Sequence, residues 1–196
     1  MKARPEHGKE DFFEMYLALV HTDINERFVI LLKNGISGGT ALLSFIQNLD
    51  FYLDYSEEKL PPEEAIREEL IGIVRWFSII ESNSETHLKI LTKPLLESLY
   101  VGEYSEGEYI ILAEKETSIK KKEMWGRMYA EVHSRWTDLE ILLDSVRNLY
   151  KLVSDETVEK TWWCNTENTL PEFLGLIEAL ELALQRTAEK VVLQFL

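Results

Sequence analysis

Apolar residues recur at intervals of three and four positions along most of the chain, and this spacing is the strongest constraint on its fold. Residues spaced in this way lie on one face of an α-helix. The longest periodic stretch runs from about residue 118 to residue 153. Its apolar face is formed by Trp125, Val132, Trp136, Leu139, Leu143 and Val146. We predict one long helix here, with this face buried as the spine of a bundle.

Shorter amphipathic segments predict further helices on both sides of this stretch. They cover about residues 12–20, 24–32, 40–53, 63–82, 85–100 and 170–196. Thr169 and Glu172 have the spacing of a capping box, which predicts the start of the last helix. The sequence therefore predicts an all-α, multi-helix bundle in a single domain spanning residues 1–196.

Residues 100–112 differ from this pattern because tyrosines and β-branched residues flank a Ser105-Glu106-Gly107 turn signal. Such a segment is typical of a hairpin, and a tyrosine-rich ordered loop is the alternative. We therefore expect at most one short β-hairpin in the bundle, near residues 100–112.

The composition is that of a globular protein, with 45% hydrophobic and 29% charged residues. A single cysteine, Cys164, excludes a disulfide framework and a cysteine-based zinc site. No apolar run approaches the roughly 20 residues that a membrane-spanning helix needs. Residues 1–11 are charged and lack the apolar region of a secretory signal. We therefore expect a cytoplasmic protein that makes no contact with a membrane.

The net charge of −14 disfavours nucleic-acid binding, which depends on neutralising phosphates. The one basic run in the chain is Lys120-Lys121-Lys122. If any surface binds nucleic acid, we expect it there. The alternative is that these lysines only solvate the start of a helix.

Motifs for metals, nucleotides and nucleophiles give little support for catalysis. The four histidines form neither Glu-x-x-His nor His-x-x-x-His pairs, so we predict no metal and no cofactor. Asp50 with Asp54, and Glu140 with Asp144, share helix faces as in a magnesium-binding pyrophosphohydrolase. In a helical chain with 35 acidic residues, such pairs also arise by chance. The glycine-rich segment 34–39 lacks the Lys-Ser or Lys-Thr that follows a phosphate-binding loop.

Arg127 and His133 form an Arg-x5-His motif on the long predicted helix. This motif resembles the Arg-x4–6-His motif of HEPN domains, which are small all-α proteins. The resemblance implies a metal-independent ribonuclease that acts as a dimer, with Arg127 and His133 as its catalytic residues. This chain departs from the pattern at Met128, where the family usually has a polar residue. On a straight helix the two side chains also point about 120° apart. The alternative is a solvated Arg127, with His133 beside the core.

The last predicted helix carries large apolar residues up to Leu196. Its core-facing stripe leaves other apolar positions uncovered, which predicts an interface with a partner or a second copy. The predicted interface residues are Leu174, Leu182, Val192 and Leu196.

Three functions follow from these observations. The first is a non-enzymatic helical interaction protein or accessory subunit of a cytosolic complex. The second is the HEPN-like ribonuclease that uses Arg127 and His133. The third is an acidic inhibitor that mimics nucleic acid.

Overall fold

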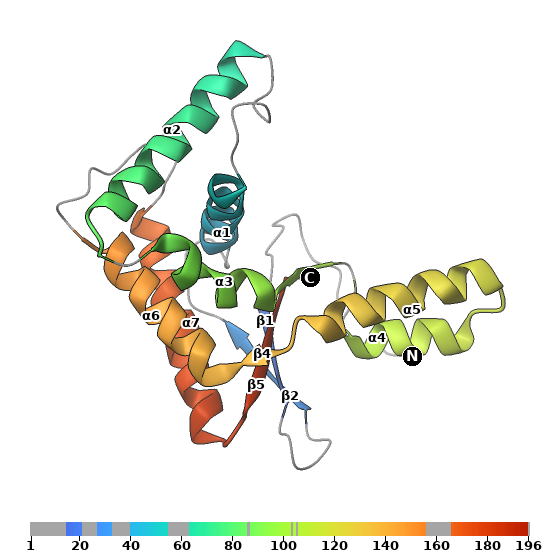
Figure 1. Cartoon of the computed structure of the whole chain (residues 1–196). Coiled ribbons are helices and arrows are strands. Elements are labelled where there is room, and N and C mark those ends of the chain that lie inside the picture. Colours follow the sequence, from blue (N-terminus) through green and yellow to red (C-terminus); the bar gives the residue numbers. More distant parts are fainter. Residues whose placement is uncertain are drawn as a thin grey trace, which may run out of the picture.

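The structure is a computed structural model that describes residues 15–20, 27–32, 40–54, 63–85, 87–102, 104, 106–155 and 166–195. Within these residues the chain forms seven helices and one five-stranded sheet (Figure 1). The helices are α1 (Thr40–Leu53), α2 (Glu64–Ser82), α3 (Leu88–Ser98), α4 (Glu106–Lys115), α5 (Ile119–Ser134), α6 (Leu139–Val153) and α7 (Thr166–Gln185). The strands are β1 (Met15–Val20), β2 (Arg27–Leu32), β3 (Leu99–Val101), β4 (Thr137–Asp138) and β5 (Lys190–Phe195). The predicted class, mostly helical with a small β element, is confirmed.

Strand β5 is the centre of the sheet, which has the order β2-β1-β5-β3. One edge of β5 pairs antiparallel with β1, in a register that places Leu17 opposite Leu193. The other edge pairs in parallel with β3 and, nearer its start, antiparallel with the short β4. β5 therefore pairs with three strands, β1, β3 and β4, that are far apart in sequence.

The position of the β element differs from the prediction. Residues 15–20, 27–32 and 190–195 were expected in helices and form strands instead. Residues 100–112 do not form a hairpin, because β3 ends at Val101 and the helix α4 begins at Glu106. The three strands are runs of six residues, and runs that short fit helical and strand spacing almost equally well. Their pairing partners decide between the two.

The predicted long helix over 118–153 is two helices. α5 ends at Ser134, and the chain passes through the short β4 before α6 begins at Leu139. Asp138 caps α6, since its carboxylate accepts a hydrogen bond from the backbone N–H of Ile141 at 3.1 Å. Of the predicted spine, Val132, Leu139, Leu143 and Val146 are buried. Trp125 and Trp136 are only partly buried, and they belong with Val132 to a separate cluster.

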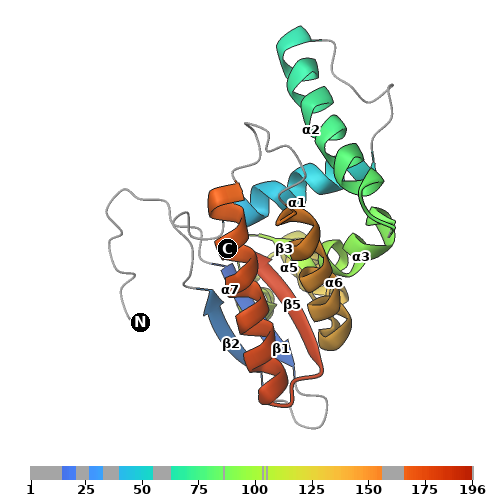
Figure 2. The ribbon, with the colours of Figure 1, turned by 90° about the vertical axis from the view of Figure 1, so that its left-hand side faces the viewer.

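The main core is formed by helices α1, α2, α3, α6 and α7 together with one face of β5, and α2 packs on α1 away from the sheet (Figure 2). Phe45 of α1 is at its centre, with its ring 5.4 Å from that of Phe173 and 5.5 Å from that of Phe77. The sheet contributes Val191 and Leu193, both fully buried. Burial of this aromatic and aliphatic surface is the dominant stabilising term of the fold.

Pro94 lies inside α3, and α6 forms a hydrogen bond to the turn that precedes it. Proline has no N–H for the carbonyl four residues earlier, and its ring disturbs the preceding turn. In that turn the carbonyl of Leu91 accepts a hydrogen bond from the buried hydroxyl of Ser145 on α6. This bond links the two helices at the irregular turn.

A second cluster covers the opposite face of β5. It is built around Val192, Tyr100, Tyr109 and Val132, which are all buried. Because successive strand residues point to opposite faces, Val192 faces this cluster while Val191 and Leu193 face the main core. Both faces of β5 are therefore covered by protein.

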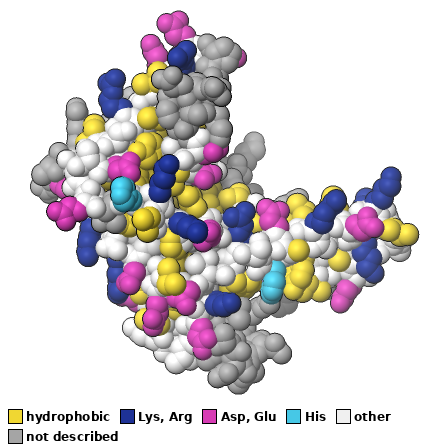
Figure 3. All heavy atoms as spheres, in the orientation of Figure 1, with side chains coloured by type: hydrophobic (Ala, Val, Ile, Leu, Met, Phe, Trp, Pro, Cys, Tyr) yellow, Lys and Arg dark blue, Asp and Glu magenta, His cyan; other side chains and the backbone are white. Residues whose placement is uncertain are grey.

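Helices α4 and α5 form a helical hairpin that projects away from the rest of the molecule (Figure 1). We call this hairpin, residues 106–134, the arm. Its base holds the second cluster, and its tip is the turn between Lys115 and Ile119. Dark-blue and yellow side chains gather at the tip in the space-filling view (Figure 3). The arm carries both charged side chains and exposed large apolar side chains.

Candidate functional site

The structure does not bring Arg127 and His133 together within one chain. Both lie on α5, which is helical without interruption from Ile119 to Ser134. Arg127 is exposed, and the side chain of His133 is 56% exposed. Their separation of six residues therefore leaves the two side chains about 120° apart.

His133 instead pairs with Glu106, at the base of the arm. Its Nδ1 lies 2.9 Å from Oε1 of Glu106, whose side chain is buried. The imidazole also stacks on Tyr129, with the ring centres 5.6 Å apart and the planes 22° from parallel. A carboxylate at one ring nitrogen fixes the orientation of a histidine, as it does in catalytic triads. Sequence reasoning missed Glu106, because it lies 27 positions away from His133.

The basic run lies at the tip of the arm, in the first turns of α5. Lys120, Lys121 and Lys122 are exposed, and Ile119 beside them is 76% exposed. The turn before them is held by Glu116, whose carboxylate accepts the backbone N–H groups of Ser118 and Thr117, both at 3.0 Å. The bond from Ser118 is the main reason that the pKa of Glu116 is lowered. The lysines therefore extend from an ordered turn.

The predicted interface of the C-terminal segment is divided by the structure. Leu174 and Leu182 are on α7 and are 43% and 38% exposed. Val192 was placed in the interface wrongly, because it lies in β5 and is fully buried inside the chain. Leu196 lies outside the described residues. The helical expectation for 190–195 is the source of the error, since a strand exposes a different set of side chains.

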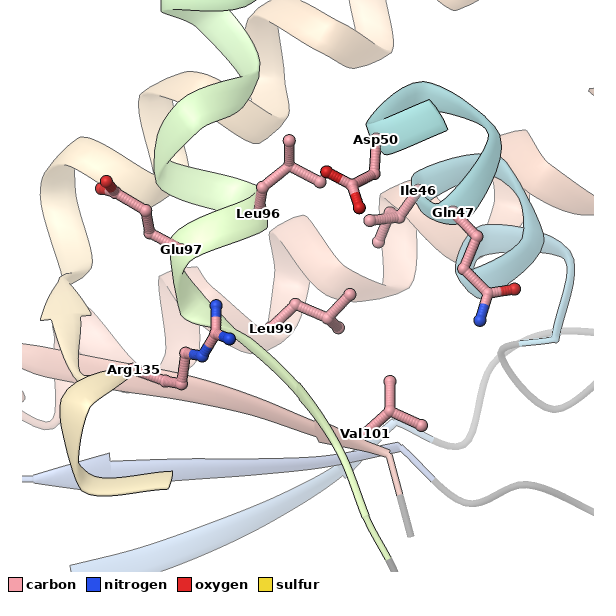
Figure 4. Close-up of a pocket in the computed structure, with 8 residues that line it drawn as sticks. All are labelled: Ile46, Gln47, Asp50, Leu96, Glu97, Leu99, Val101 and Arg135. Carbon is pink, nitrogen blue, oxygen red and sulfur yellow. The ribbon is translucent and has the colours of Figure 1, made fainter. Parts of the chain in front are cut away.

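A cleft of about 340 Å³ opens between α1 and α3 (Figure 4). Its lining residues come from α1, α3, β3 and the turn after α5: Ile46, Gln47, Asp50, Leu96, Glu97, Leu99, Val101 and Arg135. Ile46 is fully buried, while Leu96 and Leu99 are half-buried and complete an apolar floor. The rim is polar and is formed by Gln47, Asp50 and Arg135.

Opposite charges stand on facing walls of this cleft. Figure 4 shows the Asp50 carboxylate extending from α1 and the Arg135 guanidinium extending from below α3. Among the described residues, Arg135 forms no ion pair with Asp50 or Glu97. Glu97 points away from α1 in the close-up, and it pairs with Lys93 at 3.6 Å. From the sequence, Asp50 was considered only with Asp54, as a magnesium pair or a chance spacing, and Arg135 was not singled out.

The described part of the chain contains no group of three histidine, cysteine or carboxylate side chains placed to hold a metal ion. Among the described helices, none is both long and apolar enough to cross a membrane. The segment with Cys164 and the glycine-rich segment 34–39 lie outside the described residues.

Comparison with known proteins finds no matching family model, no matching curated protein and no matching solved structure. The function is therefore argued from the residues themselves.

Proposed function

We propose that this chain is a non-enzymatic interaction protein, an accessory subunit that docks on a protein partner through the tip of its arm. The observation that carries the proposal is the projection of α4 and α5 from the body (Figure 1), with exposed isoleucines along the arm and at its tip. Ile110, Ile111 and Ile119 are 39%, 47% and 76% exposed. Exposed apolar groups gathered on one element are typical of a contact surface.

The base of the arm is anchored firmly enough to present that surface in one orientation. The hydroxyls of Tyr100 and Tyr109 are 2.8 Å apart and share a buried hydrogen bond. Tyr104 packs edge-on against both Tyr109 and Trp125, with ring centres 5.8 and 5.9 Å apart. Edge-to-face aromatic pairs are worth about 0.5–1.5 kcal/mol beyond their buried area. A preorganised element loses less entropy on binding than a flexible one.

The chemistry of the tip favours a protein partner over a nucleic acid. Ile119 is followed directly by the exposed Lys120-Lys121-Lys122 and preceded four positions earlier by the exposed Lys115, so the matching surface is an apolar depression with acidic groups on its rim. The outer part of the arm, residues 110–123, carries no aromatic side chain on which a base would stack. Glu114, Glu116 and Glu123 lie among the lysines in sequence, so the outer part of the arm is not the uniformly basic surface that binding to a phosphate backbone favours.

Site-specific photo-crosslinking in the native cell tests this proposal. A photoreactive amino acid replaces Ile119 in one variant and Ile90 of α3, which is 72% exposed, in the control. We expect one discrete adduct from position 119 that survives nuclease treatment and is absent from position 90. Replacing Lys120, Lys121 and Lys122 by glutamate should abolish it.

The same experiment has outcomes that contradict the proposal. Equal adducts from both positions, or none from position 119, would show that the tip is not a docking surface. An adduct removed by nuclease would replace the protein partner with a nucleic acid at the three lysines.

The HEPN-like ribonuclease is retained as a second candidate because Glu106 fixes the imidazole of His133. An oriented imidazole is a requirement for general acid–base catalysis. If this candidate is right, RNA is cleaved in the presence of a chelator, and His133→Ala and Arg127→Ala remove the cleavage. His87→Ala changes another exposed histidine and should have no effect. Cleavage that persists in His133→Ala belongs to a contaminant.

A further inference from the structure

The cleft between α1 and α3 combines an apolar floor with two opposite charges on its walls. Ile46, Leu96 and Leu99 form the floor. Arg135 and Asp50 stand on facing sides of it (Figure 4). Sites for small ligands commonly pair apolar walls with a few polar groups that fix the orientation of the ligand.

The two charged residues lie on separate elements of the fold. Arg135 is the last residue of the turn that ends α5, with its backbone N–H donating to the carbonyl of Val132 at 3.0 Å. Asp50 lies in the last turn of α1, where its carbonyl accepts the N–H of Asp54 at 3.1 Å. Arg135 and Asp50 form no ion pair with each other among the described residues. A ligand that carries both charges can therefore pair with both side chains.

The volume limits the size of such a ligand. The cleft of about 340 Å³ is near the lower end of the range for ligand pockets, roughly 300–1,000 Å³. An amino acid or a dipeptide fits this space, and larger molecules would extend into solvent. Guanidinium groups bind carboxylates through two parallel hydrogen bonds, which gives Arg135 a defined role.

We propose that this cleft binds a small zwitterion with an aliphatic side chain, a free amino acid or a short peptide. The ligand carboxylate pairs with Arg135, its ammonium group pairs with Asp50, and its aliphatic part packs on Ile46 and Leu99. Gln47 stands beside the site with an amide that accepts or donates a further hydrogen bond. This proposal does not depend on the arm or on its partner.

Isothermal titration with four probes tests the ligand class on the whole chain. Leucine and the dipeptide Leu-Leu carry both charges, 4-methylpentanoate lacks the ammonium group, and 3-methylbutylamine lacks the carboxylate. We expect leucine or Leu-Leu to bind at least about tenfold more tightly than either single-charge analogue, a difference of about 1.4 kcal/mol. The comparison of leucine with Leu-Leu separates a free amino acid from a peptide.

Two charge-removing variants test the assigned roles. Arg135→Gln should weaken leucine and 4-methylpentanoate by about tenfold and leave 3-methylbutylamine unchanged. Asp50→Asn should weaken leucine and 3-methylbutylamine by about tenfold and leave 4-methylpentanoate unchanged. Arg67→Gln on α2 and Asp144→Asn on α6 make the same changes at exposed positions outside the cleft, and they should bind like the wild type.

Several results overturn the proposal. These are the absence of saturable binding below about 10 mM, single-charge analogues that bind as tightly as leucine, and less than a twofold effect of both cleft variants. If a variant unfolds, the leucine site is mapped instead on the wild-type protein by its amide chemical shifts. Shifts on addition of leucine must then map to Gln47, Leu96 and Val101, and shifts elsewhere contradict the site.

Discussion

Tyr100 and Tyr109 place two phenol groups inside the base of the arm. Burial is the main cause that raises the pKa of Tyr100, and its hydrogen bond to Tyr109 adds to the effect. The neutral phenol is therefore favoured in the folded chain. Since the unfolded phenol titrates near pH 10, the unfolded chain loses this proton first as the pH rises.

The sign of the resulting pH dependence follows from linkage. Below about pH 10 both states keep the proton, and the contribution of Tyr100 to stability is fully present. Above that pH the free energy of unfolding should fall by about 1.4 kcal/mol per pH unit on account of Tyr100. Urea unfolding between about pH 9 and 11 should show a shallower fall for Tyr100→Phe. The pKa of Tyr52 is also raised by burial, but Tyr52 is present in both proteins and contributes equally to both curves. Parallel curves for the two proteins would contradict the assignment.

The capping-box spacing of Thr169 and Glu172 is present in the sequence, but it predicted the wrong hydrogen-bond partner for Glu172. The sequence predicted that Glu172 caps its own helix, but α7 begins earlier, at Thr166. The buried carboxylate of Glu172 instead accepts the backbone N–H of Leu42 at 2.7 Å. Leu42 is in the first turn of α1, where N–H groups have no partner within the helix and the helix dipole favours an anion.

We therefore predict that Glu172→Leu destabilises the chain by about 1–3 kcal/mol, because it leaves a buried N–H group without this acceptor. Glu172→Gln keeps an acceptor oxygen and should lose less. Glu178→Leu is the matched control on an exposed face of α7, and it should change stability by no more than about 0.5 kcal/mol. Chemical denaturation measures all three. Equal effects at positions 172 and 178 would mean that the contact to α1 adds nothing.

At the scale of elements, the helices with long periodic patterns were predictable from the sequence. The predicted segments at 40–53 and 63–82 agree with α1 (Thr40–Leu53) and α2 (Glu64–Ser82). The strands were not predictable from their short apolar runs alone, because β1 pairs with β2 on one side and with the distant β5 on the other. The break near Trp136 was missed for the same reason: β4 exists by pairing with Val191 and Lys190 of β5.

The candidate sites were less predictable than the helices. Asp50 and Arg135 lie on different elements that are far apart in sequence, so no spacing rule connects them. The partner of His133 was likewise hidden, since Glu106 begins a helix that sequence reasoning took for a hairpin. The basic run was found, because contiguous residues need no tertiary information.

Helix α6 offers a test of the buried stripe that the sequence predicted. Leu143 is 2% exposed in the main core, while Ile141 on the same helix is 57% exposed. We predict that Leu143→Ala lowers the free energy of unfolding by about 2–5 kcal/mol through lost burial and a cavity. Ile141→Ala should change it by no more than about 0.5 kcal/mol. Urea denaturation measures both, and similar losses would mean that α6 packs through another face.

At the scale of the whole molecule, Leu182 and Val192 were predicted to share one interface. Leu182 lies on α7, whereas Val192 lies in the buried strand β5. Val192→Glu places a carboxylate between the sheet and the base of the arm, where Val192 is fully buried. We predict that this variant loses more than about 4 kcal/mol and is largely unfolded, because a buried charge without a partner is costly. Leu182→Glu lies on an exposed part of α7 and should remain folded.

Circular dichroism and urea denaturation of the two single variants distinguish these outcomes. A stable Val192→Glu protein would place that residue on the surface and restore the predicted interface. If Leu182→Glu is folded, sedimentation then shows whether its loss of an apolar side chain changes the state of association. A dimeric wild type that becomes monomeric in this variant would support self-association through α7.

The central place of β5 also governs how fast the chain reaches its native state. Pairing β5 with β1 joins residues 190–195 to residues 15–20, so the sheet needs closure over nearly the whole described chain. Contacts between neighbours, such as those of α4 with α5, form sooner because little loop entropy is lost. Intermediates that contain the helical hairpins but lack β5 leave the two faces of the sheet open. The step in which β5 inserts between β1 and β3 should therefore limit the rate of folding.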